Sequence, residues 1–587
     1  MNKKNKQEKS GNIMLMIIWV VTLFILTIIG LIFFQKHPTK VFACTLLALF
    51  SSSAISTHDL VTSFSNQGVL TLVLLMICSL ALEKTRILRY IAKSVIKPNY
   101  ETSWIKLFSI TALFSSVLNN TAIVSTLLAP IRNNPYHAPS KLLLPLCYAA
   151  TLGGMLTLVG TSTNLVVNSL VINSGLPAID FFDFTLTGLA VTLTCGVVLY
   201  FSRHALPANL ANKEDMSTYL IDSEVQPTSA MIGKSIEKNG LRHLESLFLV
   251  EIVREQRVIS PVTPTEVIKN GDRLIFSGDI TKVMQLQQFD GLALFAKDNG
   301  LPLDNLTEVL IRPESVLVGH TLKESGFRAL FNAAVVAIKR DGERLSGKLG
   351  NIKIQAGDFL VLAVGDDFQV RKNIHKNFII LSGVEPEDKL NGYKEWLVAC
   401  GFFLAIIGSA FNIIPLFNSL FLFLGLLILT GCLTQAEIIR RLPIDIWLIV
   451  SSALCLSQAL TNSGAMNIFD AVLKNYASTL PPIIALIVIY LLTWLFTELV
   501  TNNAAAALML PIGIATALSL HANPMAFIMV VAFAASSSFL SPYGYQTNLM
   551  VFSAGQYRIK DFIRQGGFLC ITYATVSIMS IVFIFGL

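Results

Sequence analysis

Long apolar runs fill both ends of the chain, and a middle segment of different character separates them. Runs of the length needed to cross a bilayer of about 30 Å recur through residues 13–201 and again through residues 396–585. Residues 214–388 instead alternate short apolar stretches of strand length with charged residues. The pattern predicts a polytopic α-helical membrane protein, in which two membrane halves, residues 1–213 and 389–587, flank a soluble α+β insert.

One apolar run in each half is interrupted near its centre by polar residues. The interrupting triplets are Asn119, Asn120 and Thr121 in the first half and Thr501, Asn502 and Asn503 in the second. Polar groups at this depth in a membrane are costly unless they face a cavity or a bound ion. Each triplet therefore predicts the tip of a re-entrant hairpin, with helix-to-helix hydrogen bonding as the plainer alternative.

A glycine-containing motif lies in a second long run of each half, as GTSTNLVV and as GYQTNLMV. Its matched positions are 384 residues apart: Gly160 and Gly544, Thr163 and Thr547, and Asn164 and Asn548. Glycine permits close backbone approach and unusual torsions, so both motifs predict a break in a helix. The hairpin triplets have nearly the same separation, 382 residues from Asn120 to Asn502. Such matched pairs indicate an ancestral duplication, as expected of secondary transporters.

The distribution of basic residues suggests how the two halves are inserted. Lys and Arg gather near the ends of apolar runs and in residues 84–106, which the positive-inside rule assigns to the cytoplasm together with the insert. About five spans and one hairpin per half then make the halves two inverted repeats. This count leaves the N-terminal lysines outside, so either the tail is tolerated there or the weak run 41–55 is not a span.

Amide, hydroxyl and main-chain oxygens at the tips and breaks are ligands that suit a hard cation such as Na⁺. We expect one Na⁺ in each half, held by Asn120, Gly160 and Asn164 in the first and by Asn502, Gly544 and Asn548 in the second. Helices that begin at the breaks would point positive dipole ends into the same space, which favours an anionic substrate. The further candidate binding residues are Asn119, Thr121, Thr161, Thr163, Thr501, Asn503, Ser541, Pro542 and Thr547.

Composition argues against other classes of protein. Of the 587 residues, 53% are hydrophobic and 14% are charged, and the net charge of +7 follows membrane topology better than a nucleic-acid surface. No set of nucleophile, base and oxyanion donor is recognisable, which disfavours an enzyme. Tyr543-Gly544-Tyr545 lacks the Thr-Val that precedes it in a potassium filter, which disfavours a channel.

Glu498, inside an apolar run, could relay protons or serve as a structural acceptor.

The insert is itself a tandem repeat with a period of 86 residues. Seven positions recur at this spacing: Gly233, Gly240, Arg242, Ile252, Arg254, Gly271 and Asp272 match Gly319, Gly326, Arg328, Ile338, Arg340, Gly357 and Asp358. Each copy is predicted to fold as strand, short helix, strand, GD turn and strand, so residues 214–300 and 301–388 form two small α+β modules. Residues 204–388 contain no GxGxxG motif, which argues against NAD.

Four segments, LNNTA, GGMLTLVGTSTNLVVN, TELVTNNAAAALMLP and ASSSFLSPYGYQTNLMV, resemble the divalent anion:sodium symporter family, within the wider ion transporter group that includes citrate permeases. The insert resembles two TrkA-C domains, also called RCK C-terminal domains. The resemblance implies a homodimer in the inner (plasma) membrane, with a scaffold and a mobile transport domain that carries Na⁺ with a dicarboxylate, citrate or sulfate by an elevator movement. For the insert it implies either regulation by a small cytosolic ligand or a structural role in dimerisation.

The hairpin tips depart from the Ser-Asn-Thr pattern of that family. Asn119 and Thr501 stand in place of Ser, and Asn503 stands in place of Thr, so the substrate cannot be carried over. The sequence leaves open which anion is carried, whether Na⁺ or H⁺ drives transport, and which ligand the TrkA-C domains bind. A ligand-gated channel and a membrane-anchored sensor are the alternatives to a transporter.

Overall fold

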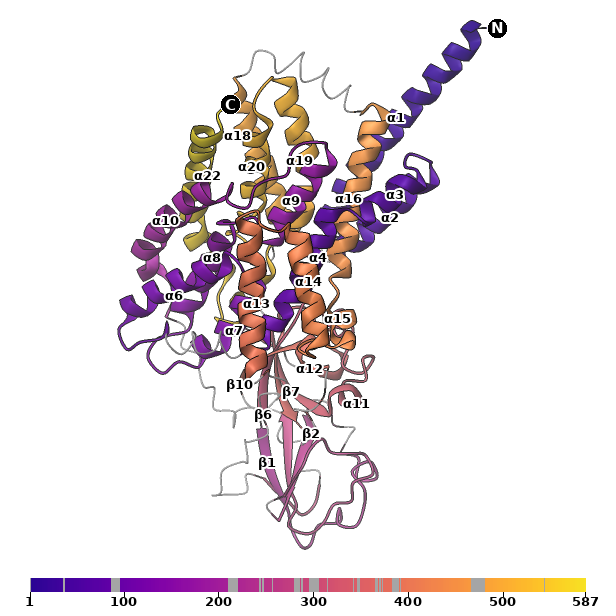
Figure 1. Ribbon diagram of the computed structural model, residues 1–587. Coiled ribbons are helices and arrows are strands. Elements are labelled where there is room, and N and C mark those ends of the chain that lie inside the picture. The colour runs from indigo at the N-terminus through magenta and orange to yellow at the C-terminus, as the bar shows by residue number, and fades with distance from the viewer. Residues whose placement is uncertain are drawn as a thin grey trace.

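The structure is a computed structural model of the chain (Figure 1). It describes residues 2–34, 37–85, 95–208, 220–241, 244, 247–255, 257–278, 286, 289–294, 306–313, 315–340, 343–345, 349–364, 368, 371, 373–382, 390, 392–465, 481–542 and 544–587. The predicted domain boundaries at 213/214, 300/301 and 388/389 lie outside these residues, as do Tyr543 and most of the basic segment that follows Lys84.

Helices make up both membrane halves. In the first half they are α1 (Asn2–Phe33), α2 (Pro38–Ser51), α3 (Thr57–Phe64), α4 (Gln67–Glu83), α6 (Tyr100–Ser115), α7 (Asn120–Arg132), α8 (Ser140–Gly154), α9 (Ser162–Asn173) and α10 (Thr185–Ser202), followed by the short η1 (Arg203–Ala205). In the second half they are α13 (Tyr393–Ala410), α14 (Leu416–Leu429), α15 (Gln435–Arg441), α16 (Ile444–Ser463), α18 (Pro482–Leu499), α19 (Asn502–Ser519), α20 (Pro524–Ala535), α21 (Gln546–Ala554) and α22 (Ile559–Phe585).

Both polar triplets lie where two helices of a hairpin meet. The first hairpin consists of α6 and α7, and Asn119 is the N-cap of α7, accepting a hydrogen bond from the Thr121 N–H at 3.1 Å. The second consists of α18 and α19, with Thr501 as the N-cap of α19. The capping bond of Asn119 favours the start of α7 at the triplet, whereas Thr501 makes no side-chain capping bond to α19. Each triplet therefore lies where two helices of a hairpin meet, while the re-entrant placement of the hairpins in the membrane stays a prediction.

Both glycine motifs lie in breaks between consecutive helices. In the first half α8 ends at Gly154 and α9 begins at Ser162. In the second half α20 ends at Ala535 and α21 begins at Gln546, so the long run 525–553 is two helices with an unwound segment between them. These unwound segments leave main-chain carbonyl and amide groups outside helical hydrogen bonding.

The helices form two groups (Figure 1). Helices α1–α4 pack with α13–α16, and we call this group the scaffold group. Helices α6–α10 pack with α18–α22, and we call this the core group, because it contains both hairpins and both breaks. The two groups meet where α9 packs on α4 and where α19 packs on α16. The arrangement therefore puts the hairpins in a body that contacts the rest of the membrane region mainly through two helices.

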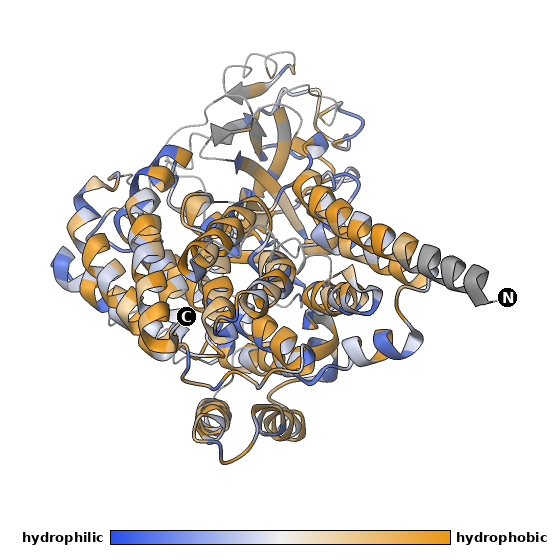
Figure 2. Cartoon of the chain, turned by 90° about the horizontal axis from the view of Figure 1, so that it is seen from above, coloured by the Kyte–Doolittle hydropathy of each residue, from blue (hydrophilic) through white to orange (hydrophobic). Residues whose placement is uncertain are grey.

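Eight helical segments of the described residues are long and apolar enough to span a membrane: 14–33, 57–83, 185–205, 393–410, 444–463, 482–499, 502–519 and 559–585. Three shorter apolar helices, α2, α14 and α20, accompany them. Viewed from above, most of the helical bundle is coloured as hydrophobic (Figure 2). The protein is thus a multi-pass membrane protein, while the number of about ten spans and their inverted insertion stay predictions.

The insert contains two five-stranded antiparallel sheets. The first has the order β3 (Arg257–Ile259), β2 (Leu247–Arg254), β4 (Arg273–Gly278), β1 (Leu220–Val225), β5 (Leu292–Leu294). The second has the order β8 (Glu343–Arg344), β7 (Ala333–Arg340), β9 (Phe359–Val364), β6 (Leu306–Ile311), β10 (Phe378–Ser382). Each strand of the second sheet begins 86 residues after its counterpart, as the sequence period predicts. The predicted short helix is α11 (Phe327–Phe331), and its counterpart in the first copy lies mostly outside the described residues.

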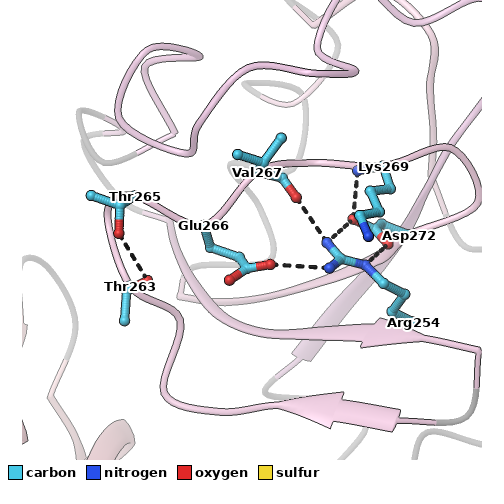
Figure 3. A network of polar contacts seen from close by, with 7 residues as sticks. All are labelled: Arg254, Thr263, Thr265, Glu266, Val267, Lys269 and Asp272. Carbon is cyan, nitrogen blue, oxygen red and sulfur yellow. Dashed lines mark hydrogen bonds and ion pairs between the residues drawn. The ribbon is translucent and has the colours of Figure 1, made fainter.

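A salt bridge at the GD turn is the same in both sheets. Arg254 donates from Nε and Nη2 to the two carboxylate oxygens of Asp272, each at 2.8 Å, and from Nη2 to the Val267 carbonyl (Figure 3). Arg340 makes the corresponding bonds to Asp358, also at 2.8 Å. Asp272 is fully buried, and its hydrogen bonds are the main reason why the pKa of Arg254 is raised. The recurring arginine and aspartate thus fix the turn of each sheet.

Candidate functional site

The amide of each hairpin tip is held by a hydroxyl one turn earlier in the same hairpin. Ser115 Oγ donates to Asn120 Oδ1 at 2.6 Å and also to the Ala150 carbonyl of α8. Thr497 Oγ1 donates to Asn502 Oδ1 at 3.0 Å and to the Ala535 carbonyl of α20. The two hydroxyls are 382 residues apart, as are the two asparagines. Each tip is therefore tied to the end of the helix that precedes the break.

The asparagine of each TN motif holds its own break open. Asn164 Nδ2 donates to the carbonyls of Gly154 and Thr157, at 3.3 and 2.9 Å. Asn548 Nδ2 donates to the corresponding carbonyls of Ser538 and Ser541, at 2.9 and 3.1 Å. All three positions recur at a separation of 384 residues. Because these bonds replace helical ones, they stabilise the unwound segment in each half.

Glycines are required where the break approaches the hairpin. A Cβ on Gly160 would lie 2.6 Å from the Gly154 carbonyl oxygen, and one on Gly154 would lie 2.8 Å from Asn120 Oδ1. A Cβ on Gly544 would meet the Ser538 side chain and lie 3.1 Å from the Thr497 carbonyl. A larger residue at position 160 would require the backbone to move, and one at 154 or 544 would displace the Asn120 or the Ser538 side chain. Gly160 and Gly544 thus allow the tips and the breaks to come into contact, as predicted.

The two halves meet at their motifs. Tyr545 accepts a hydrogen bond from Asn120 Nδ2 at 2.9 Å and lies 3.4 Å from Thr161 Oγ1, with its hydroxyl between the first tip and the first break. Ser162 and Thr163 each donate to Asn503 Oδ1 at 3.3 Å, which joins the first break to the second tip. The contacts run from Asn120 through Tyr545 and the first break to Asn503. Both tips and both breaks therefore belong to one polar cluster inside the core group.

Four helices begin at this cluster, namely α7, α9, α19 and α21. The N-caps of α9, α19 and α21, which are Thr161, Thr501 and Tyr545, form no side-chain capping hydrogen bond. Amide N–H groups and the positive ends of helix dipoles are therefore directed at one small region, which favours an anion.

Several buried polar atoms of the cluster have no hydrogen-bond partner within the described part of the chain. They are Asn164 Oδ1, Thr501 Oγ1, Asn502 Nδ2 and Thr547 Oγ1. Their residues are buried or nearly so, and an unpaired polar group in such a place costs about 1–3 kcal/mol unless a ligand satisfies it. The set combines a carboxamide oxygen, which suits a cation, with a carboxamide N–H₂, which suits an anion. The arrangement can thus bind both kinds of ion.

Three predicted site residues take part in other ways. Ser541 contributes its carbonyl, which accepts from Asn548. Thr121 contributes its N–H to the cap of α7, and its side chain is half-buried. Pro542 is buried beside the second break, where it has no N–H to donate.

The sequence leaves two roles open for Glu498 and assigns no binding role to Tyr545. Glu498 Oε1 accepts hydrogen bonds from the N–H groups of Phe539 and Leu540, both at 3.1 Å, which agrees with the role of a structural acceptor. Tyr545 was not among the predicted residues. Its position is 384 residues after Thr161, so the repeat spacing itself was the signal that could have identified it.

Comparison with known proteins places the chain among membrane transporters. Residues 13–532 match the citrate transporter family. An uncharacterized transporter of Synechocystis is 30% identical over 552 residues, which cover 90% of each chain. A putative sulfur deprivation response regulator of Chlamydomonas reinhardtii is 30% identical over 556 residues, 89% of this chain and 94% of the relative.

A relative with a named cargo matches a smaller part of the chain. Sodium/sulfate cotransporter 1 of Chlamydomonas reinhardtii is 29% identical over 358 residues, which are 59% of this chain and 41% of that protein. The family match, by contrast, extends through the first half, the insert and the second hairpin. The chain is therefore a transporter and not an enzyme, and it belongs to the citrate transporter family.

Proposed function

We propose that this protein is a Na⁺-coupled symporter of a small divalent anion. The observation that carries the proposal is the set of buried, unpaired polar atoms where both hairpin tips and both helix breaks meet. Na⁺ binds between tip and break in each half, at Asn120, Gly160 and Asn164 and at Asn502, Gly544 and Asn548. The anion binds at the converging helix N-termini, beside the cations that neutralise it.

Sulfate is the first candidate among the anions, ahead of dicarboxylates and citrate. The phenol of Tyr545 occupies the cluster at the position where the first half has the smaller Thr161. A bulky ring there leaves less room for a long carboxylate than for a compact tetrahedral anion. The name of the sodium/sulfate cotransporter relative supports the same order, and that of a more distant sodium-dependent dicarboxylate transporter keeps dicarboxylates as the second candidate.

Uptake into proteoliposomes tests the function directly. With the full chain reconstituted, we expect an inward Na⁺ gradient to drive accumulation of labelled sulfate, and succinate and citrate to be taken up more slowly. An imposed H⁺ gradient without Na⁺ should drive little uptake, because Glu498 is engaged by backbone N–H groups. Uptake driven by H⁺ alone would favour proton coupling, and currents without a coupling ion would favour a channel.

Transport proceeds by an elevator movement, in which the core group moves against the scaffold group. The contact of α9 with α4 and of α19 with α16 supports this assignment, because these helices separate the ion cluster from the rest of the membrane region. The protein acts as a homodimer in the plasma membrane, with the insert in the cytoplasm. The exposed apolar side chains of α13 and α14, such as Leu404 and Leu429, support an interface or a lipid contact on that face.

The insert regulates transport through the second module. Arg132, at the end of α7, forms an ion pair with Glu308 of β6 at 2.6 Å, and its guanidinium lies 4.7 Å from the centre of the Phe359 ring. Asn133 donates to the Leu381 carbonyl of β10 at 2.7 Å. Gly357 lies against Leu549 of α21. The second module of the insert therefore contacts α7, which begins at the first hairpin tip, and α21, which begins at the second break.

We expect this attachment to slow transport, and we call it the brake. The insert continues into α13 of the scaffold group while its second sheet contacts α7 of the core group, so it ties together two bodies that must move apart. Glu308→Ala removes the carboxylate partner of the buried Arg132 guanidinium, which weakens the attachment by at least about 1 kcal/mol. The initial uptake rate should therefore rise at least about fivefold. A regulatory ligand of the TrkA-C modules, or dimerisation through them, would act on the same contact.

Glu101→Ala is the matched control for this prediction. Glu101 pairs with Arg203 at 2.7 Å within the core group, and its side chain is 56% exposed. It makes no hydrogen bond or ion pair to the described residues of the insert. Uptake by this variant should equal that of the wild type. A rate for Glu308→Ala that is unchanged or lower, in protein that is inserted in equal amount, would contradict the brake.

A further inference from the structure

The two proposed Na⁺ sites differ at the side-chain oxygen of the asparagine in each break. Asn164 and Asn548 occupy matched positions, and each donates through Nδ2 to two main-chain carbonyls of its own break. Because those donations fix which end of each carboxamide is nitrogen, the free end of each is an oxygen. Both side chains are fully buried. The environment of these two oxygens therefore decides how well each break can bind a cation.

Asn548 Oδ1 is already occupied by a hydrogen bond from a thiol, whereas Asn164 Oδ1 is free. Cys147 Sγ, on α8 of the other half, lies 2.9 Å from Asn548 Oδ1 and donates to it. Asn164 Oδ1 has no partner among the described residues. The positions 384 and 385 residues after Cys147 are Val531 and Ala532, and neither side chain carries a hydrogen-bond donor. The asymmetry thus follows from one cysteine that the second half does not repeat.

We propose that Cys147 is a positioning residue that makes the second Na⁺ site the weaker of the two. A Na⁺ ion that binds Asn548 Oδ1 competes with the S–H donor for the electron density of the same oxygen. The sulfur does not compensate, since it is a soft atom and a poor ligand for a hard cation. At Asn164 the Na⁺ ion meets an oxygen that has no competing donor among the described residues. This inference rests on the proposed function, and it adds that the sites fill in order, with Asn164 first and Asn548 second.

The consequence is measurable in the Na⁺ dependence of uptake. When two ions are required and one site is much weaker, the weak site alone sets the half-saturating Na⁺ concentration, and the activation curve has a Hill coefficient close to that of a single site. Loss of the thiol bond brings the two affinities together. The half-saturating concentration then falls and the curve becomes steeper, without a change in which residues touch the ion.

The experiment compares Cys147→Ala and Cys147→Val with the wild type in proteoliposomes. The two variants differ in side-chain volume, but both lack the hydrogen-bond donor. An effect that both share is therefore caused by the loss of the hydrogen bond and not by a cavity. We expect the half-saturating Na⁺ concentration to fall about fivefold in both, as for loss of one weak hydrogen bond, with a higher Hill coefficient. Cys195→Ala, a buried cysteine of α10 in the same group, should leave the curve unchanged.

Na⁺-dependent thermal stabilisation of the purified full chain in detergent provides a second readout that does not require substrate. The midpoint of stabilisation should shift to lower Na⁺ in both Cys147 variants. If wild-type uptake depends on Na⁺ but neither curve shifts in either variant, the inference about Cys147 is wrong while the proposed function stands. If the wild type shows neither Na⁺-dependent uptake nor stabilisation by Na⁺, both the proposed function and the inference fail.

Discussion

Replacing either tip asparagine by alanine should nearly abolish Na⁺-driven uptake. In Asn120→Ala the tip loses its bonds to Ser115 and Tyr545, together with a proposed Na⁺ ligand. In Asn502→Ala it loses the bond to Thr497 and the unpaired N–H₂ that the anion would meet. Loss of a buried bond to a charged ligand costs about 3 kcal/mol, so we expect initial rates to fall about a hundredfold in each variant.

The control for this prediction is a cap asparagine far from the cluster. Asn99 accepts hydrogen bonds from Glu101 and Thr102 at the first turn of α6, at the other end of the same hairpin arm. Asn99→Ala should lower stability by about 1 kcal/mol through the lost cap but leave the Na⁺ dependence of uptake intact. Normal, Na⁺-dependent uptake by Asn120→Ala or Asn502→Ala would show that the tips are not part of the ion site.

Breaking the salt bridge at the first GD turn should unfold much of the first sheet. Arg254→Met leaves the fully buried Asp272 carboxylate with the Lys269 N–H at 2.8 Å but without its guanidinium (Figure 3). A buried charge that loses its partner costs about 3–5 kcal/mol. Hydrogen exchange in the full chain should therefore speed up at least about a hundredfold for the amides of β2 and β4.

The same arginine has a second partner that serves as the control. Glu266 receives Nη1 of Arg254 at 3.1 Å and is 27% exposed, so Glu266→Gln should cost less than about 1 kcal/mol and leave exchange in β2 almost unchanged. Arg340→Met should destabilise the second sheet as Arg254→Met does the first, because its bonds to Asp358 have the same lengths. Equal exchange in Arg254→Met and the wild type would mean that the turn does not depend on this pair.

The positions of the tips and breaks could be predicted because they follow from local chemistry. A polar triplet inside an apolar run marks the turn between two helices, with Asn119 as a side-chain cap in the first half, and glycine allows the close contacts at Gly160 and Gly544. The local order of residues is sufficient for both. The spacing of 384 residues also anticipated the matched hydrogen bonds of Asn164 and Asn548.

The contacts between the halves could not be predicted in the same way. Tyr545 reaches Asn120 across 425 positions of sequence, and Cys147 reaches Asn548 across 401. Neither residue resembles its counterpart in the other half, so the repeat marks Tyr545 as a site position but does not indicate which residue either side chain contacts. The attachment of Arg132 to Glu308 was also outside the reach of the sequence, because charged residues at helix ends usually indicate only topology.

The position of β10 affects how the protein can be made without aggregating. An exposed edge strand offers unpaired amides and carbonyls to any neighbouring chain, but β10, at one edge of its sheet, packs beside α7. The opposite edge is β8, only two residues long. Because α7 is synthesised well before β10, the helix that covers this edge is already in the nascent chain when β10 leaves the ribosome. The order of synthesis therefore protects this edge of the second sheet from pairing with other copies during translation.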